Sequence, residues 1–136
     1  MNKKEGISLL SFLEAVETDY WDKDSKVDLP KSLVYAIGRN IQKLTPTRKE
    51  IEEFWKGIQD VWRKEFKFDE DKYGKDKEYK KKADEEWKKY QLSEDVQKAL
   101  ETLLEESANV ELHKVDDLEG CVVQSSWLTE LDKLVK

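Results

Sequence analysis

The chain has 136 residues, of which 41% are charged and 38% hydrophobic, with a formal net charge of −6 at pH 7. Five Trp, five Tyr and four Phe supply enough apolar mass for one folded domain over residues 1–136 without disulfides or metals. The acidic balance argues against binding nucleic acid by phosphate neutralisation, and Cys121, as the only cysteine, excludes an internal disulfide. No stretch approaches the roughly 18 consecutive apolar residues of a membrane span, and the N-terminus has no secretory signal pattern, so we expect a cytoplasmic protein that does not enter membranes.

Apolar residues at offsets of three and four predict two amphipathic helices in the first third of the chain. The first begins with Ser8 as N-cap, and a charged loop over residues 21–29 separates it from the second. Pro30 marks the start of the second helix. The stripe of the first helix is Leu9, Phe12, Leu13, Val16 and Tyr20, and that of the second is Leu33, Val34, Ile37, Ile41 and Leu44.

A break at Thr45, Pro46 and Thr47 is predicted to separate the second helix from a third. Thr47 and Glu50 have the spacing of a capping box, in which each side chain satisfies a free backbone amide. The third helix is expected to end near Phe68. Its predicted core face is Ile51, Phe54, Trp55, Ile58, Val61, Trp62 and Phe66.

Residues 69–89 alternate Lys with Asp and Glu, which predicts an exposed charged helix after a loop at Gly74. The narrow apolar stripe of this helix is Tyr79, Ala83, Trp87 and Tyr90. Ser93 is typical of the start of a fifth helix, which should end near Ser107. The stripe of the fifth helix is Val96, Ala99, Leu100, Leu103 and Leu104.

After residue 107 the period changes. Val110, Leu112 and Val115 suggest a short strand, with residues 121–123 after Gly120 as its partner. Ser126 is expected to cap a closing helix that carries Trp127, Leu128, Leu131, Leu134 and Val135. The predicted fold is mainly α, with five to six helices packed as a small bundle and a short β-hairpin near the C-terminus.

The motifs of catalysis and metal binding are incomplete. The loop that begins at Asp69 has Tyr73 and Lys80 where a calcium loop needs oxygen ligands. His113 is the only histidine, and no nucleophile signature surrounds Cys121. We therefore predict no enzyme, no cofactor, no metal and no catalytic residue.

The C-terminal part of the chain resembles small uncharacterised helical accessory proteins of tailed bacteriophages. The resemblance covers Ala99 to Glu106, Val110 to Val115, Asp117 to Gly120 and Trp127 to Val135, and it does not extend to the charged stretch Asp69 to Lys89. It implies an accessory protein made beside virion or host-takeover genes, with no catalytic residues to transfer.

These observations favour a non-enzymatic protein-binding accessory factor, acting in virion assembly or on a host protein. Its partner would be a phage structural protein, a host protein or a second copy of the chain, whereas direct nucleic-acid binding is not expected. The alternative is an acidic inhibitor that mimics nucleic acid in a host nuclease or CRISPR-type effector.

The segment from Val110 to Val135 is the predicted partner-binding module, because a strand edge there could add a strand from another chain. The predicted binding residues are Val110, Leu112, Val115, Trp127 and Leu128. In the other interpretation, the same segment simply closes the core.

Overall fold

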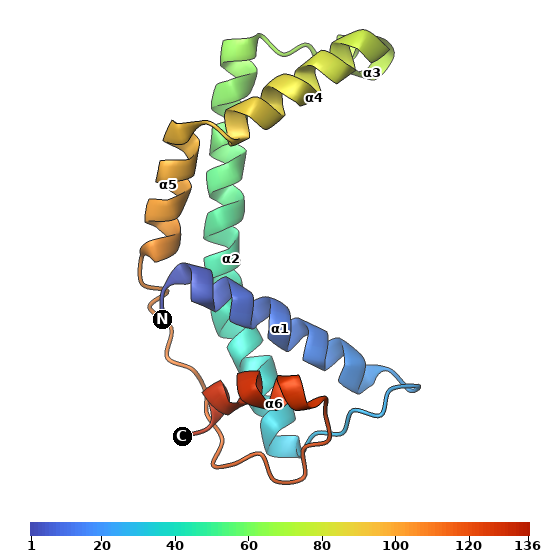
Figure 1. Cartoon of the computed structure of the whole chain (residues 1–136), viewed down its shortest axis with the longest axis vertical. Helices are drawn as coiled ribbons and strands as arrows, with labels where there is room; N and C mark the ends of the chain where they lie inside the picture. Colours follow the sequence, from blue (N-terminus) through green and yellow to red (C-terminus); the bar gives the residue numbers. More distant parts are fainter. The chain divides into compact units, whose positions relative to one another are not determined.

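The computed structural model describes every residue from Met1 to Lys136, and 72% of them are helical. The α-helices are α1 (Lys3–Trp21), α2 (Lys31–Phe66), α3 (Glu70–Lys75), α4 (Lys77–Gln91), α5 (Glu94–Glu105) and α6 (Ser125–Leu131), followed by a 3-10 helix, Asp132–Leu134 (Figure 1). No strand is present. The predicted mainly α helical bundle is confirmed, and none of its helices combines the length and apolar character needed to cross a bilayer.

The chain forms two compact units. Unit 1 comprises Met1–Arg48 and Ser107–Lys136, and unit 2 comprises Lys49–Glu106. The long helix α2 contributes its first half to unit 1 and its second half to unit 2. A single domain over residues 1–136 stays a prediction.

Helix α1 begins earlier than its apolar stripe suggested. The Asn2 side chain accepts a hydrogen bond from the Glu5 amide at 2.8 Å, and the Glu5 carboxylate accepts one from the Asn2 amide at 3.1 Å. This capping box satisfies two amides that the start of a helix leaves free. The predicted start at Ser8 was therefore wrong, since Ser8 lies inside the helix.

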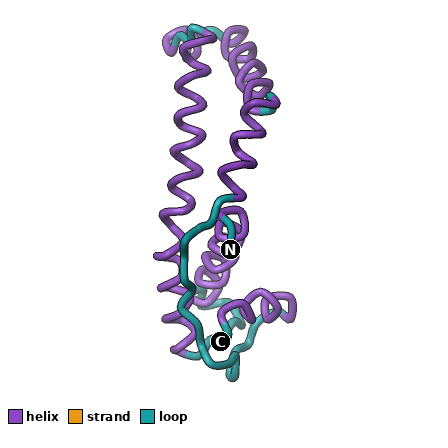
Figure 2. Tube along the Cα trace, turned by 90° about the vertical axis from the view of Figure 1, so that its left-hand side faces the viewer, coloured by secondary structure: helices purple, strands orange, loops and turns teal.

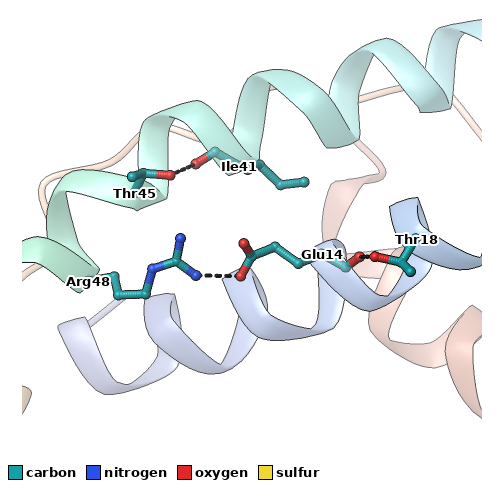
Figure 3. Close-up of polar contacts among 5 residues, drawn as sticks. All are labelled: Glu14, Thr18, Ile41, Thr45 and Arg48. Atoms are coloured by element: carbon teal, nitrogen blue, oxygen red, sulfur yellow. Dashed lines mark hydrogen bonds and ion pairs between the residues drawn. The ribbon is translucent and has the colours of Figure 1, made fainter.

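The predicted break between the second and third helices was also wrong, because α2 continues through Pro46. Proline has no amide to donate to the carbonyl of Gln42, four residues earlier, and so removes one helical hydrogen bond. The hydroxyl of Thr45 donates to the Ile41 carbonyl at 2.7 Å on the turn beside it (Figure 3). Thr47 is buried in the helix and does not cap it.

An ion pair joins α1 to α2 within unit 1. The Arg48 guanidinium donates to the Glu14 carboxylate, and the Glu14 carbonyl accepts from the Thr18 hydroxyl at 2.9 Å (Figure 3). Both charged side chains are more than a third exposed, so the pair contributes at most about 1 kcal/mol.

The core of unit 1 is aliphatic and fully enclosed. Helix α1, the connection between α1 and α2, helix α2 and the C-terminal segment each supply side chains to it. These are Leu9, Leu10, Leu13, Val16, Leu29, Leu33, Ala36, Ile37, Leu44, Val115, Leu131 and Leu134. The stripes predicted for the first two helices thus lie largely in this core.

The predicted β-hairpin is absent. The Val115 amide donates to the Leu134 carbonyl at 2.7 Å, and the Val122 amide donates to the Asp28 carbonyl at 2.7 Å. The two halves of the expected hairpin thus pair with other segments instead of with each other. Their apolar side chains pack on the helical core, which determines where each half lies.

Asn40 holds the extended C-terminal segment against α2. Its side chain is 0% exposed, its Nδ2 donates to the His113 carbonyl at 2.9 Å, and its Oδ1 accepts from the His113 amide at 2.7 Å. The Lys43 ammonium donates to the Glu111 carbonyl at 2.8 Å. Figure 2 shows this loop running past the first half of α2. Side chains of α2 therefore supply hydrogen bonds that a neighbouring strand would otherwise give.

Acidic caps define the short helices of unit 2. Asp69 accepts from the Lys72 amide at the start of α3, and Asp76 accepts from the amides of Glu78 and Tyr79 at the start of α4. Gly74 lies inside α3, so the predicted loop at Gly74 was wrong.

The predicted start of α5 agrees with the structure, whereas that of α6 is one or more residues late. Ser93 precedes α5, as predicted, although its hydroxyl donates backward to the Tyr90 carbonyl. Helix α6 begins at Ser125 after Gln124, so Ser126, the predicted cap, lies inside the helix.

We expect Asn40→Leu to lower the free energy of unfolding by about 1–3 kcal/mol, because the His113 amide and carbonyl lose their partners in a buried environment. Chemical denaturation measures the loss. Hydrogen exchange should also become faster in residues 107–124. The control is Gln42→Ala at an exposed position of the same helix, and an Asn40 variant as stable as this control would contradict the role of the amide.

Candidate binding site

The predicted partner-binding residues lie in unit 1 and mostly face its core. Val115 is buried, and half-buried side chains of the set pack against the core cluster. Trp127 lies edge-on to Phe12 with ring centroids 5.9 Å apart. Leu128 is 38% exposed. The half-buried members are Val110, Leu112 and Trp127. Their role in partner binding stays a prediction.

The backbone at the proposed strand edge is already hydrogen-bonded within the chain. The Val115 carbonyl accepts from the Lys136 amide at 2.9 Å, its amide donates to Leu134, and both groups of His113 are bonded to Asn40. These residues pack and pair as the core-closing interpretation expects.

A different surface in unit 2 has the features of a binding site, and its centre is Trp62. The Trp62 ring stacks on Phe66 at 4.9 Å and contacts Phe68 at 5.8 Å and Trp87 at 5.3 Å, measured between ring centroids. Tyr73 lies 5.3 Å from Phe68. Rings from α2, α3, α4 and the connection between α2 and α3 thus form one aromatic cluster.

The end of α2 brings Phe68 back toward the helix. Lys67 has a φ of 56°, in the left-handed region, and the Phe68 amide donates to the Arg63 carbonyl at 2.9 Å. This is the hydrogen bond that closes a helix in the Schellman manner. The Arg63 guanidinium then lies over the Phe68 ring, 5.1 Å from its centroid.

Unit 2 buries far less apolar surface than unit 1. Its only buried hydrophobic residues are Trp62, Ala83 and Val96. Val61, predicted as core, is 47% exposed, so that assignment was wrong. The rest of the predicted face is half-buried, namely Ile51, Phe54, Trp55, Ile58 and Phe66. Aromatic surface therefore remains open to solvent.

This surface is hollowed into a cleft of about 270 Å³ between α2, α3 and α4. Aromatic rings form its walls and charged side chains its rim. The lining residues are Gln59, Trp62, Arg63, Phe68, Glu70, Tyr73, Ala83, Asp84 and Trp87. Sequence reasoning missed the cleft, because the turn at Lys67 that brings its walls together leaves no motif. The clustering of aromatics between residues 54 and 90 was the available signal.

One hydrogen bond joins Tyr73 to Asp84 in the lining of the cleft. The Tyr73 hydroxyl donates to the Asp84 carboxylate at 2.7 Å. This hydrogen bond, together with burial and the negative charge of Asp84, raises the pKa of Tyr73. Tyr73 therefore stays a neutral hydrogen-bond donor.

Arg63 is incompletely paired at the other side of the cleft. Its Nη1 lies 3.7 Å from Glu70 Oε1, which is a long ion pair, and its Nε is enclosed without a hydrogen-bond partner. A buried donor without a partner costs about 1–3 kcal/mol, and such groups call for an explanation in a folded protein. The cleft thus combines apolar walls with a donor that the free protein leaves unsatisfied.

Cys121 and His113 lie in unit 1 and have structural neighbours. Cys121 packs against the core, where burial and then the charge of Asp28 raise the pKa of its thiol. The His113 ring lies edge-on to Tyr35, with centroids 5.2 Å apart. The surroundings of Cys121 favour the neutral thiol, which is a poor nucleophile.

We expect Trp62→Ala to lower the free energy of unfolding by roughly 3–5 kcal/mol, because it removes the ring at the centre of the aromatic cluster. Thermal and chemical denaturation followed by circular dichroism measure this loss. Val61→Ala at the neighbouring exposed position should change stability by less than about 0.5 kcal/mol. Equal effects at both positions would show that the Trp62 ring is not the centre of the packing.

We expect iodoacetamide to alkylate Cys121 slowly near neutral pH, because only the thiolate reacts and the pKa of this thiol is raised. The rate should increase only at pH values above those at which an ordinary thiol ionises. Denaturant should restore an ordinary rate and pH profile. The pKa of Cys121 is higher in the folded than in the unfolded protein. The contribution of this thiol to the free energy of unfolding is therefore full at pH values below the unfolded pKa, and it is lost as the pH rises through the folded pKa. An ordinary thiol profile in the native protein would refute this assignment.

Comparisons with known proteins add no family to these observations. No family model, no curated protein and no solved structure matches the chain. The resemblance to phage accessory proteins accordingly stays a prediction.

Proposed function

We propose that the protein is a non-enzymatic accessory factor that acts by binding another protein through the aromatic cleft of unit 2. The observation that carries this proposal is the open cluster of rings around Trp62, in a unit that buries only three hydrophobic residues. Concave sites lined by aromatic side chains with a few polar groups are typical binding sites.

The composition of the cleft supports a protein partner. Trp, Tyr and Arg are the residues that most often dominate binding energy at protein interfaces. Trp62, Trp87, Tyr73 and Arg63 lie together there, within a rim that includes Glu70. An apolar centre with a polar rim is the usual anatomy of such an interface.

The biological setting is proposed from the resemblance alone. We place the protein among accessory factors of tailed phages, acting in the host cytoplasm or the virion on a phage structural protein or a host protein. Self-association would use the same surface with a second copy as the partner.

A nucleic-acid mimic remains the alternative, and the charge distribution ranks it second. A mimic needs carboxylates gathered on one face, whereas Lys98 pairs with Glu94 and Lys89 with Glu86 along the helices of unit 2. The net charge of −6 is its main support.

A photo-crosslinking amino acid separates the proposed surface from the C-terminal module. We expect a crosslinker at position 73, in the cleft, to form an adduct with another protein in the native cell, and one at exposed position 21, outside the cleft and the C-terminal module, to form none. Mass spectrometry of the adduct identifies the partner. A crosslinker at position 128 tests the C-terminal module, and adducts from that position alone would replace the cleft with the module. If neither position 73 nor position 128 forms an adduct, the result contradicts the proposed function.

A further inference from the structure

We infer that the cleft takes one large apolar side chain from a basic segment of the partner protein. The inference rests on the proposed function and names the chemistry of the partner. Three features of the cleft carry it: the shape and character of the walls, the cations already placed on the rings, and the carboxylates at the rim.

The walls favour an apolar side chain. Trp62, Phe68 and Trp87 surround the hollow, and Ala83, which is 1% exposed, forms a small and deeply placed part of its lining. Removing an aliphatic or aromatic side chain from water between such rings is favourable.

A cation in the cleft is disfavoured, although aromatic walls can attract one. The protein already places its own cations on the rings: Arg63 over Phe68 at 5.1 Å and Lys80 over Tyr73 at 5.5 Å. Lys72 lies 6.0 Å from the centroid of Tyr79 beside the cleft. An incoming ammonium or guanidinium would meet like charge at those faces. The guest between the rings is therefore apolar.

The rim favours basic residues on either side of that guest. The lining carries the carboxylates of Glu70 and Asp84, whereas the cations beside them, Arg63 and Lys80, already lie on the rings of Phe68 and Tyr73. The Glu70 side chain is 80% exposed, and Asp84 keeps acceptor sites beyond the one used by Tyr73. With a chain charge of −6, these groups steer a basic segment toward the cleft.

Arg63 adds a polar contact that fits a peptide. Its side chain is 41% exposed, so the outer edge of the guanidinium can donate to a backbone carbonyl of the bound segment. An acidic segment could also accept from Arg63, but Glu70 and Asp84 would repel it. A neutral backbone carbonyl beside an apolar side chain can accept from this exposed edge without that repulsion.

Selection from a random peptide library on the immobilised full chain tests this chemistry. The enriched peptides should share a large apolar residue flanked by Lys or Arg. Replacing that residue by Ala in a synthetic peptide should weaken binding about tenfold. In nitrogen-15 spectra, the peptide should shift the indole resonances of Trp62 and Trp87 and leave those of Trp21 and Trp127 unchanged.

Two matched charge variants test the rim. Asp84→Asn keeps an acceptor for the Tyr73 hydroxyl but removes the charge, and it should weaken binding about threefold at low salt. Asp95→Asn makes the same change at an exposed position outside the cleft lining and should leave binding unchanged. Circular dichroism verifies that both variants are folded.

Several results would overturn the inference. These are enriched peptides that are acidic or lack an apolar residue, no enrichment at all, unshifted Trp62 and Trp87 resonances, or equal affinities of the two charge variants. Adducts from position 73 together with any of these results would leave protein binding in place and refute only the chemistry assigned to the cleft. Loss of both the adducts and the peptides would refute the proposed function as well.

Discussion

The buried amide of Asn40 stands where a helix meets a segment that has no regular structure of its own. Residues 107–124 cross unit 1 without forming a helix or a strand, so their backbone groups need partners from elsewhere. Asn40 supplies both a donor and an acceptor to His113. With the segment fixed there, Val115 enters the core and pairs with Leu134. The closing helices of unit 1 then complete a core that α1 and α2 alone would leave open.

The two units are packed in different ways. Unit 1 encloses aliphatic side chains from distant parts of the sequence, whereas unit 2 arranges aromatic rings around Trp62 and leaves many half-exposed. Rings can hold a shape with few contacts because each one buries a large area. The same rings remain available to another protein. This contrast leads us to place binding in unit 2 and not in the C-terminal segment.

Periodicity was enough to predict most helices, because their stripes face a core. The prediction failed at Pro46. Proline usually interrupts a helix, but α2 continues on both sides of this residue. The prediction failed again at residues 110–123, since an alternating pattern also suits a loop that packs every second side chain on helices. The cleft could not be predicted, because the left-handed turn at Lys67 depends on tertiary contacts of Phe68 that no local pattern records.

The division of unit 1 into Met1–Arg48 and Ser107–Lys136 determines the order in which the protein can mature on the ribosome. All residues of unit 2 are synthesised before Leu131 and Leu134, whose side chains are 0% exposed in the core of unit 1. In a nascent chain, the apolar faces of α1 and α2 in unit 1 therefore lack this part of their cover until Leu131 and Leu134 have been synthesised. During translation, that uncovered face is where a chaperone would bind and where misassembly between nascent chains would start.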